Sequence, residues 1–472
     1  MVSSIRRRDL LKLTGAGVAG VVAGSFREET FAFGGEKPNI IFIMADDLGY
    51  ADLGCYGQKF IKTPHVDRMA MEGLKFTQCY TGAVVCAPSR SVLMTGQHTG
   101  HTRIRGNKGI NTPPHEGQSG RIPLRPEDFT VARLLQNAGY RTGITGKWGL
   151  GEPGSTGLPN DHGFDEWLGY LNQDHAPDYF TDFLWRNKEK QTISENADNK
   201  RRVYSHDLLT EFALDFIRKN KSRPFFLYVP YCIPHAKLEV PDLESYADKN
   251  WPEDAKIFAA MVTRMDRDVG RILDLVDELG IEKKTIVFFC SDNGSARGWQ
   301  GIFDSCGPLR EKKGSVYDGG IRTPMVVRWP GKVPVSETSE AVWYFADFLP
   351  TAAELAGVRP PENIDGVGVA EAFYAAKPSK KLARKLRNRF LYWEETSKKG
   401  FRQAVRHGDW KAVRPGQGKA LELYDLSRDI GETTDIAARH PEVVAKIEKY
   451  LGTCRTDSVH WPLPESIGPD PE

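Results

Sequence analysis

Asn39-Ile40-Ile41-Phe42-Ile43-Met44 is the stretch that sets the expected architecture, and it runs into Ala45-Asp46-Asp47-Leu48-Gly49. Five of its first six residues are apolar and three of those are isoleucine, as in short strands that a parallel sheet buries on both faces. Thr285-Ile286-Val287-Phe288-Phe289-Cys290 has the same character and ends in Ser291-Asp292-Asn293-Gly294. In open α/β sheets, ligands bind where such strands end. The sequence therefore predicts that the polar residues after both strands gather at one edge of a parallel sheet.

Those polar residues have the chemistry of a metal site. They are Asp46, Asp47, Asp292 and Asn293. Carboxylate and amide oxygens are hard ligands that suit Ca²⁺ or Mg²⁺ better than zinc. Either pair alone is about as often a turn or a helix cap. Their common position past strand ends, together with the cysteine described next, favours a metal site.

A cysteine at a predicted helix start is the third feature of this edge. It begins Cys86-Ala87-Pro88-Ser89-Arg90, and the apolar segment Ser91-Val92-Leu93-Met94 that follows indicates a helix. Backbone N–H groups and the helix dipole favour an anion at such a position. Arg90 supplies a cation for a reactive thiol, but no histidine flanks Cys86 as a base. The plain alternative is a buried structural cysteine beside a proline turn.

Three further segments bring cations to predicted strand ends. Lys147 follows a strand-like segment, His235 follows another at 224–231, and the glycine-rich basic loop 309–324 contains Lys313. Such a loop lets the backbone approach an oxyanion. A lone lysine after a strand is usually solvated, and a lone histidine is usually structural. It is the shared position of these residues that favours a functional role.

Helical patterns alternate with the strands. Residues 203–219 and 254–279 carry apolar side chains near helical spacing, and Gly280 ends the second stripe. Alternating strands and helices predict an α/β protein with a large, central, mainly parallel sheet flanked by helices.

A change of composition marks the C-terminal part of the chain. A basic segment at 377–389 is followed by three short strand-like runs and a predicted helix at 441–451. This pattern predicts a smaller subdomain with an antiparallel sheet. We place an α/β catalytic domain at residues 36–375 and a C-terminal α+β subdomain at 376–472, with the basic segment as a solvated face.

Cys86-Ala87-Pro88-Ser89-Arg90 resembles the signature of type I sulfatases. The segments described above occur in the order seen in that family, and the match spans most of the chain from about Lys37 onward. The chain thus resembles an arylsulfatase-type, formylglycine-dependent sulfatase of the alkaline phosphatase superfamily. In that family a maturation enzyme oxidises the cysteine to formylglycine, which hydrates to a geminal diol. The resemblance implies hydrolysis of sulfate esters of carbohydrates, or of small aryl sulfates.

The resemblance also implies roles for single residues. One diol hydroxyl of modified Cys86 attacks sulfur, and collapse of the other expels sulfate. Arg90 steadies the formylglycine, while Lys147, His235 and Lys313 bind sulfate and assist the leaving group. Lys313 fits the Lys-Gly position better than Lys312. The implied metal is Ca²⁺, with Mg²⁺ the less usual ion, and its ligands are Asp46, Asp47, Asp292, Asn293 and modified Cys86.

One segment departs from the family pattern. The family usually has Gly-Lys-Trp-His-Leu-Gly, whereas this chain has Gly146-Lys147-Trp148-Gly149-Leu150-Gly151. The missing histidine normally takes a proton from the second diol hydroxyl. His175 is our candidate for a replacement base, and His162 is another. Each is at least as well explained as a loop histidine with local hydrogen bonds.

The N-terminus predicts export. Arg6-Arg7-Arg8-Asp9-Leu10-Leu11-Lys12 resembles a twin-arginine signal, and the apolar stretch 13–24 is too short for a spanning helix. We expect a signal peptide and leader at 1–35, passage through the twin-arginine export machinery, and a periplasmic or secreted protein without a stable membrane span. The net charge of +2 over 472 residues gives no argument for nucleic acid binding.

Three other functions stay open. A phosphate or phosphonate monoester hydrolase of the same superfamily shares the motifs. A sulfated-glycan binding protein without turnover is conceivable because of Gly149. A hydrolase that uses the unmodified thiol of Cys86 is the weakest, since no adjacent base is evident.

Overall fold

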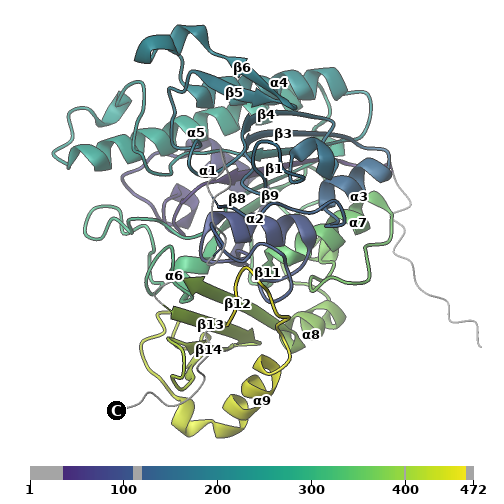
Figure 1. Cartoon of the computed structure of the whole chain (residues 1–472), viewed down its shortest axis with the longest axis vertical. Coiled ribbons are helices and arrows are strands. Elements are labelled where there is room, and N and C mark those ends of the chain that lie inside the picture. The colour runs from purple at the N-terminus through teal and green to yellow at the C-terminus, as the bar shows by residue number, and fades with distance from the viewer. Residues whose placement is uncertain (1–35, 110–119, 398–399, 464–472) are drawn as a thin grey trace, which may run out of the picture. The chain divides into compact units, whose positions relative to one another are not determined.

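The computed structural model describes residues 36–109, 120–397 and 400–463 of the chain. These residues belong to one compact unit that contains two sheets (Figure 1). The predicted export signal at residues 1–35 lies outside the described residues. No helix in the described ranges is long and apolar enough to cross a membrane.

The larger sheet has eleven strands in the order β10-β2-β9-β8-β1-β7-β3-β4-β5-β6, with β11 also paired to β2. Its centre, β8-β1-β7-β3-β4, is parallel, whereas β9 runs antiparallel to both β2 and β8. The strands are β1 Asn39–Ala45, β2 Leu74–Tyr80, β3 Arg141–Lys147, β4 Glu166–Tyr170, β5 Phe183–Arg186, β6 Glu189–Thr192, β7 Phe225–Pro230, β8 Thr285–Ser291, β9 Arg322–Arg328, β10 Glu337–Ser339 and β11 Trp343–Tyr344.

The two apolar runs of the sequence are neighbouring central strands, as predicted. Every residue of β1 and of β8 is buried. The strands are parallel, and Ala45 pairs with Ser291 in their register. The residues that follow each strand therefore emerge at the same height, at one edge of the sheet.

Helices cover both faces of the large sheet. Alternate residues of β1 point to opposite faces, so Ile40 and Phe42 join one core and Ile41 and Ile43 the other. The first core includes residues of α2 Cys86–Thr95, α3 Val131–Asn137 and α7 Phe348–Ala356. The second includes residues of α1 Pro64–Met71, α4 Ser205–Asn220 and α5 Glu253–Glu278. The predicted helices at 203–219 and 254–279 are α4 and α5.

The second sheet is antiparallel and lies in the C-terminal part of the chain, in the order β12-β13-β14-β15. Its strands are β12 Phe390–Ser397, β13 Gly400–His407, β14 Trp410–Arg414 and β15 Glu422–Asp425, with α8 Lys380–Asn388 before them and α9 Pro441–Leu451 after them. The predicted fold class is confirmed. The sequence did not predict β13, because Arg402, Gln403 and Arg406 interrupt its apolar pattern. The domain boundary at residue 375 stays a prediction.

Candidate active site

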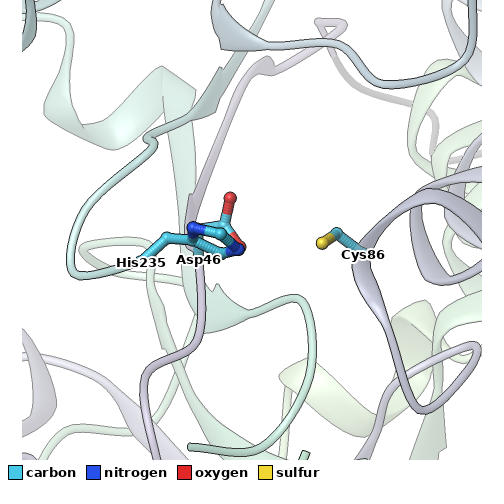
Figure 2. A group of neighbouring side chains, drawn as sticks. All are labelled: Asp46, Cys86 and His235. Atoms are coloured by element: carbon cyan, nitrogen blue, oxygen red, sulfur yellow. The ribbon is translucent and has the colours of Figure 1, made fainter. Parts of the chain in front are cut away.

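Cys86 is the first residue of α2 and is fully buried. Its sulfur faces Asp46, which follows β1, and His235, which lies in the loop after β7 (Figure 2). Ligand atoms of these three side chains all lie within 4.8 Å of one another. Chain segments far apart in the sequence therefore converge on one thiol.

Two lysine ammonium groups lie close to this thiol. Lys147, the last residue of β3, places its Nζ 3.3 Å from the Cys86 sulfur, and Lys313 Nζ lies 3.9 Å away. Burial opposes ionisation of the thiol, but the two ammonium groups outweigh it and lower the pKa of Cys86 to about 6. The site therefore favours negative charge at the position of the sulfur.

Three buried carboxylates face these cations. Asp46 Oδ2 lies 2.6 Å from Lys147 Nζ, and Asp47 Oδ1 lies 2.5 Å from Lys313 Nζ. Oxygens of Asp46, Asp47 and Asp292 lie within 4.8 Å of one another. Burial and the neighbouring charge of Asp46 raise the pKa of Asp292. Asp47 adopts a left-handed backbone with φ 71°, which non-glycine residues seldom do, as the turn after β1 requires.

Arg90 connects the carboxylates to α2. One turn after Cys86, its Nη2 donates to Asp292 Oδ2 at 2.7 Å and its Nη1 donates to the Lys147 carbonyl at 2.5 Å. Its side chain is completely buried. A buried guanidinium with these fixed partners orients Asp292 and the end of β3, and it does not contact solvent.

The structure distinguishes the two adjacent lysines of the basic loop. Lys313 reaches the cluster, whereas Lys312 is exposed and lines a neighbouring cavity of about 560 Å³. Arg297 and Arg402 line the same cavity. The cavity thus adjoins the cysteine site at Lys313 and has a cationic wall.

His235 has the surroundings of a proton donor. Its Nε2 lies 3.6 Å from Asp47 Oδ2. Burial disfavours the imidazolium, but Asp46 and Asp47 outweigh it and raise the pKa of His235. The hydroxyl of Tyr179 donates to the His235 carbonyl at 2.6 Å and holds this loop.

The residues after β1 and β8 fit a divalent cation. Asp46 Oδ1 and Asn293 Oδ1 are buried and lack a hydrogen-bond partner. Asn293 uses its Nδ2 to donate to Asp47 Oδ1 at 2.7 Å, which leaves its oxygen free toward the cluster. Buried acceptors without donors are costly unless an ion satisfies them. The donors are all hard oxygens, as Ca²⁺ and Mg²⁺ prefer.

Sequence reasoning missed two residues that support this arrangement. Ser89 lies in the cysteine motif, and its Oγ donates to the Asp292 carbonyl at 2.6 Å while it accepts from Gly82 N. The motif was visible, but nothing local indicated a partner two hundred residues away. Gln173 is the second residue, and it concerns the missing histidine.

At Gly149 the end of the Gln173 side chain occupies the space where a side chain would begin. The backbone of Gly149 is left-handed, with φ +81°, and a Cβ there would lie 2.5 Å from Gln173 Nε2. Gln173 donates to the Gly149 carbonyl at 3.1 Å, and its Oε1 is buried without a partner. A glutamine side chain thus packs where a side chain at position 149 would begin.

Neither candidate histidine joins the cluster in the described contacts. His175 Nε2 pairs with Thr181 Oγ1 at 2.8 Å, and its ring stacks on Phe183. Burial lowers the pKa of His175 to about 4. His162 Nε2 lies 3.0 Å from the Thr156 carbonyl, and burial lowers its pKa as well. The geometry therefore favours local anchoring for both residues and gives no support to His175 as a replacement base.

The fold and the site together define an α/β enzyme with a cysteine at the centre of a cation-rich pocket. The Sulfatase family model matches residues 38–358, and the model described as N-sulphoglucosamine sulphohydrolase, C-terminal, matches residues 311–457. The chain belongs to the sulfatase family, as the sequence motifs predicted. The named relatives described next are sulfuric ester hydrolases.

Relatives and solved structures agree with this placement. N-acetylgalactosamine-6-sulfatase of Sus scrofa is 33% identical over 490 residues, which cover 92% of each chain. For the Canis lupus familiaris enzyme of the same name, 33% identity extends over 71% of this chain but just under two thirds, 66%, of that relative. The crystal structure of Ps i-CgsB in complex with k-i-k-neocarrahexaose has a TM-score of 0.76 and 29% identity over 89% of this chain and 94% of that one.

A second solved structure shows the fold alone. The phosphonate monoester hydrolase of Agrobacterium radiobacter has a TM-score of 0.65 and 21% identity, over 88% of this chain and 95% of that one. The architecture is thus shared between enzymes named for different ester bonds, and the reaction has to be argued from the site.

Proposed function

We propose that this protein hydrolyses sulfate esters of a carbohydrate, through a formylglycine made from Cys86 and with a Ca²⁺ ion held by Asp46, Asp47, Asp292 and Asn293. The single observation that carries the proposal is the buried thiol of Cys86 between Lys147 and Lys313. Both are family-motif positions, and both lie where a sulfate group on residue 86 would be.

The charge balance of the site supports an anionic substrate. Three carboxylates face three cations in the site, so their charges cancel. The carboxylates are Asp46, Asp47 and Asp292, and the cations are Arg90, Lys147 and Lys313. A divalent cation on the orphaned oxygens would give the pocket a net positive charge. A sulfate monoester would then bind with favourable electrostatics in a site that excludes water.

A formylglycine at position 86 would supply a hydroxyl nucleophile toward sulfur, and a bound calcium ion would supply fixed positive charge. The chain's own residues do the rest. Lys147 and Lys313 hold sulfate oxygens in line with residue 86. His235, whose pKa is raised by the carboxylates, carries the proton for the leaving alcohol. Arg90 orients Asp292 through its hydrogen bond to that carboxylate.

The proposal of a carbohydrate substrate rests on the relatives and on the cavity beside Lys313. The relatives include an amino-sugar sulfatase, and the Ps i-CgsB structure has an oligosaccharide bound. The cavity of about 560 Å³ gives the remainder of such a substrate a place next to the reacting group. We also propose export by the predicted twin-arginine signal after modification of Cys86.

The test is mass spectrometry of the Cys86 peptide from natively produced protein, combined with turnover of paired sulfate and phosphate esters. We expect an aldehyde or its hydrate at position 86, turnover that favours sulfate, and no activity in Cys86→Ser. Hydrolysis in ¹⁸O-water should label the sulfate. Full activity with an unmodified thiol would overturn the formylglycine role, and a preference for phosphate or phosphonate esters would overturn the sulfatase assignment.

A further inference from the structure

The helix α8 lies in a stretch of unusual charge. Between Ala372 and Trp393 the sequence has no aspartate or glutamate and seven basic residues, which are Lys377, Lys380, Lys381, Arg384, Lys385, Arg387 and Arg389. All except Arg389 are exposed. Of the six exposed cations, only Arg387 forms an ion pair within the described chain, with Asp409 at 3.1 Å. This stretch is therefore a concentrated positive surface with little internal compensation.

The cations near the start of the helix do not stabilise it. Leu382 and Leu386 pack into the core, and Ser379 caps the N-terminus through a bond from Leu382 N. Lys381 and Lys385 are four residues apart, as are Lys380 and Arg384, and such like-charge pairs oppose helix formation. The first turn contains lysines and no acidic residue, although the positive end of the helix dipole favours acids there. Folding explains the two leucines, and the helix dipole favours Lys385 and Arg387 in the last turn, but neither explains the cations near the start of the helix.

A groove lies against this helix. It has a volume of about 680 Å³ and is bounded by Lys377 and Arg387 of the basic stretch, while Arg406 of β13 lines it as a buried side chain. Ala341, Val342, Leu386 and Leu391 give it an apolar floor, and Glu340 and Asp409 are its acidic residues. Cationic walls above an apolar floor suit a chain of sugar rings that carries anionic substituents.

The groove is lined by residues of both sheets, and β13 connects it to the cavity beside Lys313. Arg402 of β13 donates to the Gly314 carbonyl at 2.7 Å, next to Lys313, and it lines the cavity described above. Arg406 is four residues further along the same strand and on the same face. At roughly 3.4 Å per residue, the groove begins about 14 Å from Arg402, which lines the cavity beside Lys313. Figure 1 shows α8 beside β12, the neighbour of β13.

We propose that α8 and this groove form a docking surface for a sulfated polysaccharide, distinct from the site that cleaves the ester. The inference rests on the proposed sulfatase function and extends it to a polymeric, polyanionic substrate. Charge complementarity carries it, because unpaired lysines and arginines attract a chain of sulfate or carboxylate groups and release its counterions. A negatively charged vesicle would offer charge without sugar rings for the apolar floor.

The experiment compares two full-length variants with equal changes of charge. The first carries Lys377→Gln, Lys381→Gln, Arg384→Gln and Arg387→Gln, of which Lys377 and Arg387 line the groove, and it keeps both buried leucines. The control carries Lys219→Gln, Lys221→Gln, Lys249→Gln and Lys283→Gln, four exposed lysines elsewhere on the surface. Binding of dextran sulfate, carboxymethyl dextran and neutral dextran is measured from low to high salt, and turnover is measured with 4-nitrophenyl sulfate.

We expect the α8 variant to bind dextran sulfate at least tenfold more weakly at low salt. Its affinity should also depend less on salt, with the slope of log affinity against log salt smaller in magnitude by about two to four. The control should change less than threefold, and neutral dextran should not bind. The carboxymethyl polymer distinguishes carboxylate from sulfate as the recognised group. Turnover of the small ester should be unchanged in both variants.

Two outcomes would overturn the inference. One is equal binding of dextran sulfate by the α8 variant, the control variant and the parent protein. The other is tighter binding of phosphatidylserine vesicles or duplex DNA than of dextran sulfate at equal charge concentration. Because binding is measured without turnover, a protein that binds the polymer but cleaves no sulfate ester would contradict the proposed function and leave the docking surface standing.

Discussion

In the part of the chain that the structure describes, metal-ligand side chains gather at two places, the cysteine site and a cluster away from it, and only the first is built for a metal. The first is Asp46, Asp47 and Asp292 at the ends of β1 and β8, and the second is His98, His101 and Asp365. In both groups the ligand atoms lie within 4.8 Å of one another. Residue type and proximity therefore do not separate them.

Hydrogen bonding separates them. His98 Nδ1 accepts from Gly100 N at 3.1 Å, so its Nε2 carries the proton in the neutral ring. Asp365 accepts from His98 N at 2.8 Å and pairs with His101 Nδ1 at 2.9 Å. The first group instead leaves oxygens of Asp46 and Asn293 buried without a donor. Unsatisfied buried acceptors, and not the gathering of ligand-type residues, mark the metal site.

The sharpest way to break this comparison is to remove one carboxylate from each group. Asp292→Asn should lose bound Ca²⁺ and reduce turnover by about a thousandfold, because it removes charge from the ion and from Arg90. Asp365→Asn should keep the ion and change turnover less than about fivefold. Metal analysis after dialysis, together with sulfate ester kinetics, decides between them. Retention of calcium in the first variant and its loss in the second would reverse the assignment.

A second test uses the two adjacent lysines. Lys313→Met should lower kcat/KM about a hundredfold, since it removes a charge that faces the reacting group. Lys312→Met should lower it less than about threefold, because this side chain points away from the cluster. In protein with an unmodified Cys86, the first variant should also raise the thiol pKa from about 6, as measured by thiolate absorbance. Equal losses in both variants would contradict the placement.

A third, smaller effect is expected at His175, which resembles His98 in having its hydrogen bond inside the protein. His175→Gln should lower thermal stability and leave turnover within about fivefold, with no sulfated form of residue 86 accumulating. Mass spectrometry of the quenched reaction tests this. A trapped sulfate adduct in His175→Gln, but not in His162→Gln, would restore His175 as the replacement base.

The smallest effect concerns pH. Burial lowers the pKa of His98 to about 4, from an ordinary value of 6.5. The unfolded chain therefore takes up this proton first, so the stability contribution is complete above about pH 6.5 and is lost as the pH falls toward 4. At pH 4 this group lowers the free energy of unfolding by about 3 kcal/mol relative to neutral pH. In His98→Gln, the drop in melting temperature between pH 6.5 and pH 4 should be smaller by a few degrees than in the parent protein. An unchanged acid slope would show that His98 is not the responsible group.

The central strands and the chemistry of the site were accessible from sequence, while several supporting contacts were not. The runs that became β1 and β8 were recognised because burial on both faces leaves a continuous apolar pattern. The helix at Pro441–Leu451 was predicted with its observed bounds. Ser89 and Gln173 were missed because their partners, Asp292 and Gly149, are close only in the folded chain. The basic stretch at 377–389 was interpreted as a solvated face, and nothing local revealed the groove beside it.

The sequence by itself determined the parallel sheet, the family and the set of residues from which a sulfatase site is made, because strand burial and motif spacing are local properties. Tertiary structure decided which candidates meet. The register of β1 against β8 brings Asp46 and Asp292 to the same height, and the packing of the basic loop turns Lys313 inward and Lys312 outward. It also filled the space beside Gly149 with Gln173 and anchored His175 to Thr181. These outcomes depend on contacts between segments far apart in the chain, which no local pattern encodes.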